Sequence, residues 1–312
     1  MSLPPERGGS PAASAAAGGP PAVDSGVYTV SAATSAHGGA ASTFGSQPAV
    51  TVEGLGRRFG DLIAVDSLTF SVAQGEFFAL LGPNGAGKTT TIHMLTTLLE
   101  PTSGRASVMG YDVAREPQRV RQVLGMVFQD PALDERLTAR ENLELHAVLY
   151  GIPPRERRQA IEQALVWASL VEAADRRVRT FSGGMKRRLE LARALMHSPG
   201  VLFLDEPTLG LDPQGRRHLW ERIDALRREG LTVLMTTHNL PEAEACDRVG
   251  IIDAGRLVEI GPPGELVAKH AGEGGDLEDV FIALTGKQLR DEEATARDLM
   301  VSFAKRGGEH TR

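Results

Sequence analysis

The sequence contains little cysteine, few aromatic side chains and no long apolar run. Cys246 is the one cysteine among 312 residues, so no disulfide can form within the chain, and a reducing compartment is expected. We expect its thiol to be a small, partly buried apolar group. No stretch approaches the roughly 20 consecutive apolar residues of a membrane-spanning helix, and the N-terminus lacks a secretory pattern. These absences predict a protein that is soluble or peripheral to a membrane.

A basic excess is absent as well. The formal net charge is −6 and the aromatic content is 5%, which argues against a nucleic-acid partner that would need cationic patches and stacking rings. Two basic clusters, Arg155–Arg158 and Lys186–Arg188, fall within predicted helices. We expect both clusters to be solvated helix faces, and we expect no nucleic acid to bind.

Composition divides the chain into three parts. Residues 1–47 are mostly Ala, Gly, Ser and Pro, which predicts a disordered tail because such a segment buries too little apolar surface to offset its ordering entropy. Residues 48–285 carry the pattern of a folded domain. Residues 286–312 are charged and weakly periodic, and we expect a charged tail or loose helix there.

The folded part begins with short apolar runs and continues with strands that alternate with helices. The first runs, separated by Gly and polar turns, suggest antiparallel strands: Ala49–Val52, Leu68–Val72 and Phe77–Leu81. Later strands are expected at Val123–Phe128, Val201–Leu204, Thr232–Thr236 and Val249–Asp253. Helices are expected at Gly87–Leu99 and Pro213–Arg228. The alternation predicts an α/β fold with a mostly parallel sheet, and the antiparallel strands form a β subdomain.

The region of about 137–198 departs from this alternation. It is helical throughout, without a convincing strand. We expect a helical subdomain inserted between two strands of the α/β core.

A glycine-rich loop lies between an apolar strand and a helix, which is the setting of a phosphate-binding P-loop of pattern GxxxxGK[ST]. Its glycines let backbone N–H groups turn toward phosphate oxygens, and the helix that follows directs its positive end at the same anion. Lys88 is expected to hold the β- and γ-phosphates of ATP, and the Thr89 hydroxyl is expected to ligate Mg²⁺. The predicted nucleotide contacts are Gly82, Pro83, Asn84, Gly85, Ala86, Gly87, Lys88, Thr89 and Thr90.

Two carboxylates close a later apolar strand, Val201–Leu204. Asp205 is placed to contact Mg²⁺, as an acidic residue does at this strand end in P-loop NTPases. Glu206 could accept a proton from the water that attacks the γ-phosphate. The alternative is that Glu206 is a surface charge at a helix start.

The run Phe181–Met185 opens an amphipathic helix, in which Ser182 is a good N-cap and Gly183 and Gly184 leave N–H groups open to an anion. One face of that helix is expected to hold Met185, Leu189, Ala192, Leu195 and Met196. This run resembles the signature motif of ABC ATPases, and it stands in the family's order between a Walker A loop and a Walker B strand.

Further matches follow the family's order. Gln129 resembles the Q-loop residue that contacts Mg²⁺, Asp212 in Leu211–Pro213 resembles the D-loop, and His238 resembles the H-loop histidine that contacts the γ-phosphate. Phe59 lies where the family places an aromatic that stacks on adenine. Alternatively, Phe59 is a core residue and His238 a capped loop residue.

The resemblance implies a mechanism and partners. Two such domains pack head to tail, so that ATP lies between one phosphate loop and Ser182–Gly184 of a second copy or a homologous ATPase subunit. The chain would then dock on a separate transmembrane permease at the cytoplasmic face of the cell membrane. Alone, it is expected to show weak or concentration-dependent ATPase activity.

The sequence around Met185 and the run Leu277–Phe281 resemble the daunorubicin-resistance branch, whose systems are ABC-2 exporters of drugs, lipids or polysaccharides. Two alternatives stay open: a soluble ABC ATPase that acts on ribosomes or DNA, and a regulatory module that does not hydrolyse ATP. The retention of Lys88, Asp205, Glu206 and His238 argues against the second.

Overall fold

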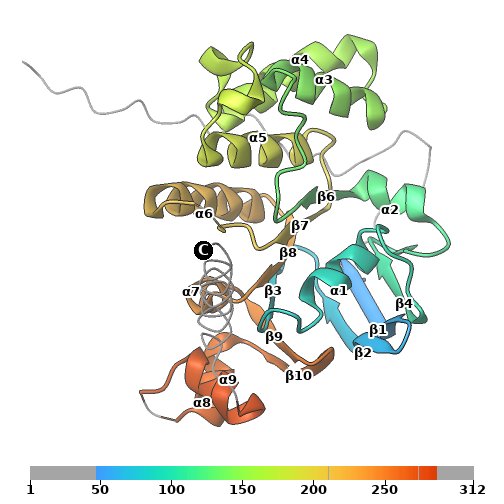
Figure 1. Cartoon of the computed structure of the whole chain (residues 1–312), viewed down its shortest axis with the longest axis vertical. Helices are drawn as coiled ribbons and strands as arrows, with labels where there is room; N and C mark the ends of the chain where they lie inside the picture. Colours follow the sequence, from blue (N-terminus) through green and yellow to red (C-terminus); the bar gives the residue numbers. More distant parts are fainter. Residues whose placement is uncertain (1–46, 210, 273, 287–312) are drawn as a thin grey trace, which may run out of the picture.

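The computed structural model describes residues 47–209, 211–272 and 274–286 (Figure 1). The two tails predicted at the ends of the chain lie outside these residues, apart from residues 47 and 286. Within the described part, no helix is both long and apolar enough to cross a membrane.

An antiparallel sheet of four strands begins the fold. Its strand order is β2-β1-β4-β5, with β1 at Val50–Phe59, β2 at Leu62–Val72, β4 at Ser103–Val108 and β5 at Tyr111–Asp112. Along β2, buried Leu68, Phe70 and Val72 alternate with exposed polar residues, which is the pattern of a strand with one face on the core.

A six-stranded sheet forms the centre of the molecule (Figure 1). Its order is β10-β9-β3-β8-β7-β6, and all neighbours are parallel except the β9–β10 pair. Its strands are β3 (Phe77–Leu81), β6 (Leu124–Val127), β7 (Val201–Asp205), β8 (Thr232–Thr237), β9 (Arg248–Asp253) and β10 (Arg256–Gly261). The predicted α/β class with a mostly parallel sheet and an antiparallel subdomain is confirmed.

The assignment of Phe77–Leu81 to the antiparallel group is wrong. This segment is β3, which lies in the central sheet between β8 and β9 and runs parallel to both. All five of its side chains are buried. Phe77, Ala79 and Leu81 pack in one hydrophobic core, and Phe78 and Leu80 pack in a second core on the opposite face of the sheet. The run is continuously apolar because both faces of the sheet are covered.

Helices cover both faces of the central sheet. On one side α1 (Lys88–Leu95) contacts strands of both sheets, and α2 (Pro117–Val123) precedes β6. The other side carries α6 (Pro213–Arg228), α7 (Leu240–Glu244), α8 (Pro263–His270) and α9 (Leu277–Thr285). In α9, Leu277, Val280 and Phe281 are fully buried in the core on this side. Helix α1 is shorter than the predicted Gly87–Leu99, because Thr97 adopts a positive φ of 63° that ends the helix. Cys246 is buried, as expected.

The helical subdomain lies beyond the β6 edge of the sheet (Figure 1). It contains α3 (Ala139–Leu149), α4 (Pro154–Ala168), α5 (Gly183–Leu195) and two short 3₁₀ turns at Val171–Ala173 and Val178–Thr180. A capping box between Thr138 and Glu141 begins α3.

Helix α5 is buried on more than one side. Leu189, Ala192 and Met196 pack within the helical subdomain, whereas Leu191 and Leu195 pack against the central core. The prediction that Leu195 shares one apolar face with Leu189, Ala192 and Met196 is therefore wrong, because α5 lies between two cores. The expectation of a solvated basic cluster at Lys186–Arg188 is also wrong for Arg187, which is only 6% exposed.

Three aromatic side chains stack where α3 meets the end of α5. The ring of Tyr150 lies 4.1 Å from both His146 and His197. His197 Nε2 donates to the Leu124 carbonyl at 2.8 Å, and His146 Nε2 lies 3.5 Å from His197 Nδ1. Burial, with the neighbouring His197 and Arg193 charges, lowers the pKa of His146 to about 3. Burial likewise lowers the pKa of His197 to about 4. Both rings are therefore neutral at physiological pH.

This cluster predicts a loss of stability in mild acid. Between the ordinary histidine pKa of 6.5 and the lowered values, the unfolded chain binds protons that the folded chain does not, so the free energy of unfolding falls as the pH drops. His146→Phe should make this fall shallower between pH 6.5 and 4. Urea denaturation at several pH values measures it, with exposed His218→Phe as the control that should match the wild-type slope.

Candidate nucleotide-binding site

Three neighbouring strands of the central sheet end at one edge. In the parallel register, Leu81 at the end of β3 pairs with Thr237 in β8, and Thr236 pairs with Asp205 at the end of β7. The loops that follow these strands therefore meet, as expected at the carboxyl ends of parallel strands, where α/β proteins bind their ligands.

The loop from Gly82 to Thr89 leaves β3 and enters α1. Close backbone approach requires glycine at both ends of this loop. A Cβ on Gly82 would lie 2.2 Å from the Ile252 carbonyl oxygen, and one on Gly87 would lie 2.6 Å from the Ala64 carbonyl oxygen. Gly87 also has a φ of 102°, which L side chains rarely adopt. The loop is thus shaped by packing to open at the N-terminus of α1, a position suited to an anion.

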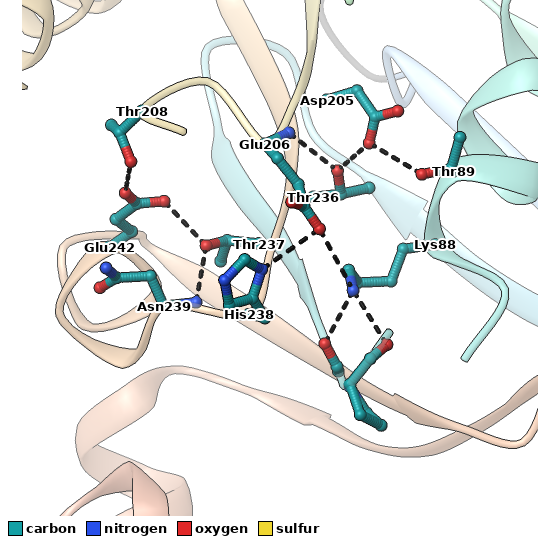
Figure 2. A network of polar contacts seen from close by, with 12 residues as sticks. Lys88, Thr89, Asp205, Glu206, Thr208, Thr236, Thr237, His238, Asn239 and Glu242 are labelled. Atoms are coloured by element: carbon teal, nitrogen blue, oxygen red, sulfur yellow. Dashed lines mark hydrogen bonds and ion pairs between the residues drawn. The ribbon is translucent and has the colours of Figure 1, made fainter. Parts of the chain in front are cut away.

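Lys88 reaches back along this loop. It is 4% exposed, and its Nζ donates to the carbonyl oxygens of Gly82 at 2.8 Å and Pro83 at 3.0 Å. The same nitrogen lies 3.6 Å from Oε1 of Glu206 (Figure 2). A buried cation is therefore held between the phosphate loop and the carboxylate that follows β7.

Asp205 is joined to two hydroxyl groups. Its Oδ1 accepts hydrogen bonds from Thr89 Oγ1 at 3.2 Å and from Thr236 Oγ1. A hydroxyl and a carboxylate oxygen in contact are hard ligands of the type that Mg²⁺ prefers, and Mg²⁺ sites of this kind are completed by phosphate and water. Among the described residues, no group of three or more His, Cys, Asp and Glu side chains could form a cage for a metal by itself. The pair fits Mg²⁺ delivered with a nucleotide.

Glu206 is held in a strained conformation. Its φ of 46° is unusual for a residue with a side chain, and strain of this sort concentrates at functional sites. Its backbone N–H lies 3.2 Å from both the carbonyl and the hydroxyl oxygen of Thr236. The carboxylate is 9% exposed, so the alternative of a surface charge is wrong.

The carboxylate of Glu206 contacts both the Lys88 ammonium and the His238 imidazole. His238 Nδ1 is 3.2 Å from Oε1, the same oxygen that lies 3.6 Å from Lys88 Nζ (Figure 2). Burial by itself raises the pKa of Glu206, but the hydrogen bond and charge of His238, together with Lys88, lower it below its ordinary value. The group is therefore ionised at neutral pH and able to accept a proton.

A third carboxylate, which sequence reasoning missed, connects the loop after β7 with the loop after β8. Glu242 in α7 is 6% exposed and accepts hydrogen bonds from Thr208 Oγ1 and, at 2.7 Å, from Thr237 Oγ1 (Figure 2). Thr208 follows Glu206 in the chain, and Thr237 precedes His238. Glu242 follows His238 closely in the sequence but belongs to no recognisable motif, so its role is visible only from its contacts in the folded chain.

Two cavities meet at Glu206 and His238. One, of about 430 Å³, is lined by the phosphate loop together with Thr90 and Gln129. The other, of about 390 Å³, shares Glu206, His238 and Leu209 with the first and extends over Glu242. The structure thus brings the P-loop, Gln129, Glu206 and His238 to one open space.

Two predicted site residues lie elsewhere. Phe59 is 45% exposed at the end of β1, so the alternative of a core residue is wrong, and the Arg57 guanidinium lies 4.6 Å from its ring centre. It does not line the cavity beside the phosphate loop. Asp212 is the N-cap of α6, where its Oδ1 accepts from the Gly215 N–H at 2.8 Å.

The Ser182 motif also lies outside both cavities. Ser182 caps α5 as predicted, because its Oγ accepts from the Met185 N–H at 3.3 Å. A Cβ built on Gly183 or Gly184 meets no atom within 4 Å. Within the described chain, neither position is therefore restricted to glycine by packing.

Comparison with known proteins decides the family. The model of the ABC transporter family matches residues 65–209. Daunorubicin resistance ATP-binding protein DrrA3 of Streptomyces coeruleorubidus is 45% identical over 77% of this chain and 75% of its own length. The chain belongs to the ABC transporter ATP-binding family. Nod factor export ATP-binding protein I of Ralstonia nicotianae is also similar to this ABC protein, with 44% identity over 73% of the chain and 71% of its own length.

Solved ABC structures have the same fold. An ATP-binding subunit of an ABC transporter superposes with a TM-score of 0.70 and 32% identity, over 76% of this chain and 99% of its own. The ATP-binding cassette MJ0796, described as dimeric and bound to ADP and Pi, gives 0.63 and 26% over 68% and 98%. The predicted family and its ATPase activity are thereby confirmed.

The Glu242 contacts predict an effect on turnover. Glu242→Gln replaces one acceptor oxygen by an amide donor, so one threonine hydroxyl must turn or lose its partner. We expect the free energy of unfolding to fall by about 1–3 kcal/mol and ATP turnover to fall by roughly 10-fold as the two loops loosen. Exposed Glu244→Gln on the same helix is the matched control, and equal turnover in the two variants would contradict the role of Glu242.

Proposed function

We propose that this ABC protein is the ATP-hydrolysing subunit of an ABC-2 type exporter and powers a separate transmembrane permease. Its similarity to a drug-resistance protein and a Nod factor export protein supports export as the direction. The cargo class is drugs, lipids or polysaccharides, and the chain acts at the cytoplasmic face of the cell membrane.

The chain's own groups would act on ATP as follows. The backbone N–H groups of the loop from Gly82 to Thr89 and the N-terminus of α1 hold the β- and γ-phosphates. Lys88 neutralises phosphate charge with an ammonium that is already held in place by two carbonyls. Phe59 stacks on the adenine, which its exposure at the end of β1 allows.

Thr89, Asp205 and Gln129 would hold Mg²⁺. The Thr89–Asp205 hydrogen bond and the position of Gln129 on the wall of the same cavity support this assignment. When bound, the ion would supply positive charge that offsets the charge of the phosphates.

The placement of Glu206 carries the proposal of hydrolysis. An ionised, largely buried carboxylate with access to the cavity beside the phosphate loop can accept a proton from the attacking water. His238, 3.2 Å from that carboxylate, would hold its orientation, and it lines the cavity that we assign to the γ-phosphate.

A second copy, or a homologous ATPase subunit, would complete the site. The glycines of Ser182–Gly184 are not required by packing within the chain, so their lack of side chains is explained by something that approaches from outside. We assign this to ATP held by the phosphate loop of the partner, with Asp212 near the contact. The dimeric cassette MJ0796 supports such an arrangement.

An exposed apolar face on α3 supports a membrane partner. On that helix Leu145 lies one turn before Val148 and Leu149, and the three side chains are 49%, 47% and 72% exposed. Helix α3 follows the loop that carries Gln129, so a partner on this face would contact a segment connected directly to the nucleotide site. We assign this face to the permease.

The hydrolytic role is tested with Glu206→Gln. Because the amide cannot accept the proton, steady-state turnover with ATP and Mg²⁺ should fall by about 10²-fold or more. The ATP-bound protein should accumulate as a dimer that size-exclusion chromatography with light scattering detects. Glu221→Gln, on the exposed surface of α6, is the matched control and should hydrolyse ATP like the wild type.

The dimer and hydrolysis have separate readouts. Wild-type turnover by Glu206→Gln would remove Glu206 as the proton acceptor. A variant that is inactive yet monomeric with saturating ATP would contradict the shared site of two copies. A wild-type chain that binds ATP without turnover would favour a regulatory module.

The membrane role is tested on α3. In cells that also express the proposed permease, the double variant Leu145→Glu/Leu149→Glu should lose about 10-fold or more of its membrane-bound fraction, since charge disfavours an apolar interface. Its ATP turnover in the absence of membranes should stay unchanged. Glu144→Gln, exposed on the same helix, is the control. Association of the wild type with ribosomes in place of membranes would overturn the transport role.

A further inference from the structure

The segment between β6 and α3, from Phe128 to Thr138, carries Gln129 and forms no helix and no strand other than an isolated bridge at Thr138. Its backbone polar groups therefore need partners from elsewhere. Three charged side chains of α5 supply partners for Phe128 and Ala132. Arg187 Nη1 donates to the Phe128 carbonyl, Glu190 Oε1 accepts from the Ala132 N–H at 3.1 Å, and Arg193 Nη1 donates to the Ala132 carbonyl.

Arg187 also contacts the loop after β7. Its Nε donates at 2.9 Å to the carbonyl oxygen of Pro207, the residue that follows Glu206. One guanidinium thus bonds to the neighbour of Gln129 and to the neighbour of Glu206. It does so from the helix whose N-terminus is the Ser182 motif.

Glu190 fixes the orientation of that guanidinium. Its Oε2 accepts from Arg187 Nη1 at 2.9 Å, and the two side chains are 0% and 6% exposed. The contacts of this guanidinium are made by Nε and Nη1, whereas its buried Nη2 has no hydrogen-bond partner among the described residues. Loss of either member of the buried pair would leave an uncompensated charge. Because the guanidinium is planar and rigid, a shift of any one of its partners is transmitted to the others.

Building on the proposed ATPase function, we propose that Arg187, oriented by Glu190, is a positioning residue that sets the Gln129 and Glu206 loops relative to the Ser182 helix. It does not line the cavity beside the phosphate loop. It acts through the carbonyls of Phe128 and Pro207, so that movement of the helical subdomain moves the residues that hydrolyse ATP.

Arg187→Lys tests this role, because lysine keeps the charge but its single ammonium cannot reproduce the planar contacts to both loops. We expect kcat to fall by about 10–100-fold, since small displacements of reacting groups have effects of this size. The dissociation constant for ATP should change by less than about 3-fold, because the phosphate loop does not contact Arg187. Turnover is measured on the purified full chain with ATP and Mg²⁺, and ATP binding by titration.

Two further variants separate positioning from folding. Arg140→Lys alters an arginine whose side-chain partners, Glu162 and Asp175, lie in the same subdomain and outside both loops, and it should leave kcat unchanged. Glu190→Gln should lower kcat as well. Combining it with Arg187→Lys should lower kcat by much less than the product of the two single effects, since both act on one contact.

The outcomes are distinct. A wild-type kcat for Arg187→Lys overturns the positioning role. The same holds if turnover falls only in proportion to the fraction of folded protein or of bound ATP. In both cases the hydrolytic role of Glu206 stands. Multiplicative effects of the two substitutions overturn the coupling through Glu190. A wild-type chain without turnover overturns the proposed ATPase function and this inference together.

Discussion

The parallel pairing of β3, β8 and β7 is the constraint on which the site depends. These strands are buried on both faces, and their register places Leu81, Thr237 and Asp205 at one edge of the sheet. The phosphate loop, the Glu206 turn and His238 are each the first residues beyond a strand that cannot slide without exposing apolar surface. Packing of the strands in the core therefore positions the functional side chains, and the loops extend only a short way beyond the strand ends.

Local strain and buried polar contacts complete the placement. Glu206 adopts a positive φ, and hydrogen bonds to Thr236 hold its backbone in that conformation. Glu242 on one side and Arg187 on the other hold the segment just beyond it, through Thr208 and Pro207. Glu206 is thus held by contacts from β8, α7 and α5, which are distant from one another in sequence. These contacts limit the conformations that its carboxylate can adopt.

The parts of this site that follow from sequence are those whose chemistry requires a fixed spacing. Glycines, a lysine and a threonine around a phosphate, or two acids at a strand end, are recognisable because few other residues could do the same work. Arg187 and Glu242 have no such spacing, since their partners are carbonyls and hydroxyls brought together by tertiary packing. The same reason explains why Arg187 was expected to be solvated and why Phe77–Leu81 was assigned to the wrong sheet. Helical periodicity and apolar runs report burial on one element, but they do not identify the neighbours.

The empty space around Gly183 and Gly184 has a consequence for how substitutions at these positions are interpreted. Substitution at Gly82 or Gly87 collides with the chain's own backbone, so any assay of folding detects it. Substitution at Gly183 or Gly184 meets nothing inside the chain, and helix propensity even favours residues other than glycine there. A survey of variants by the stability of the single chain would rank these two glycines as tolerant. Loss of function at these glycines would be detected only in a survey of growth that depends on two copies closing on a nucleotide. Positions that are tolerant in the stability survey and intolerant in the growth survey would then identify the contact between the two copies.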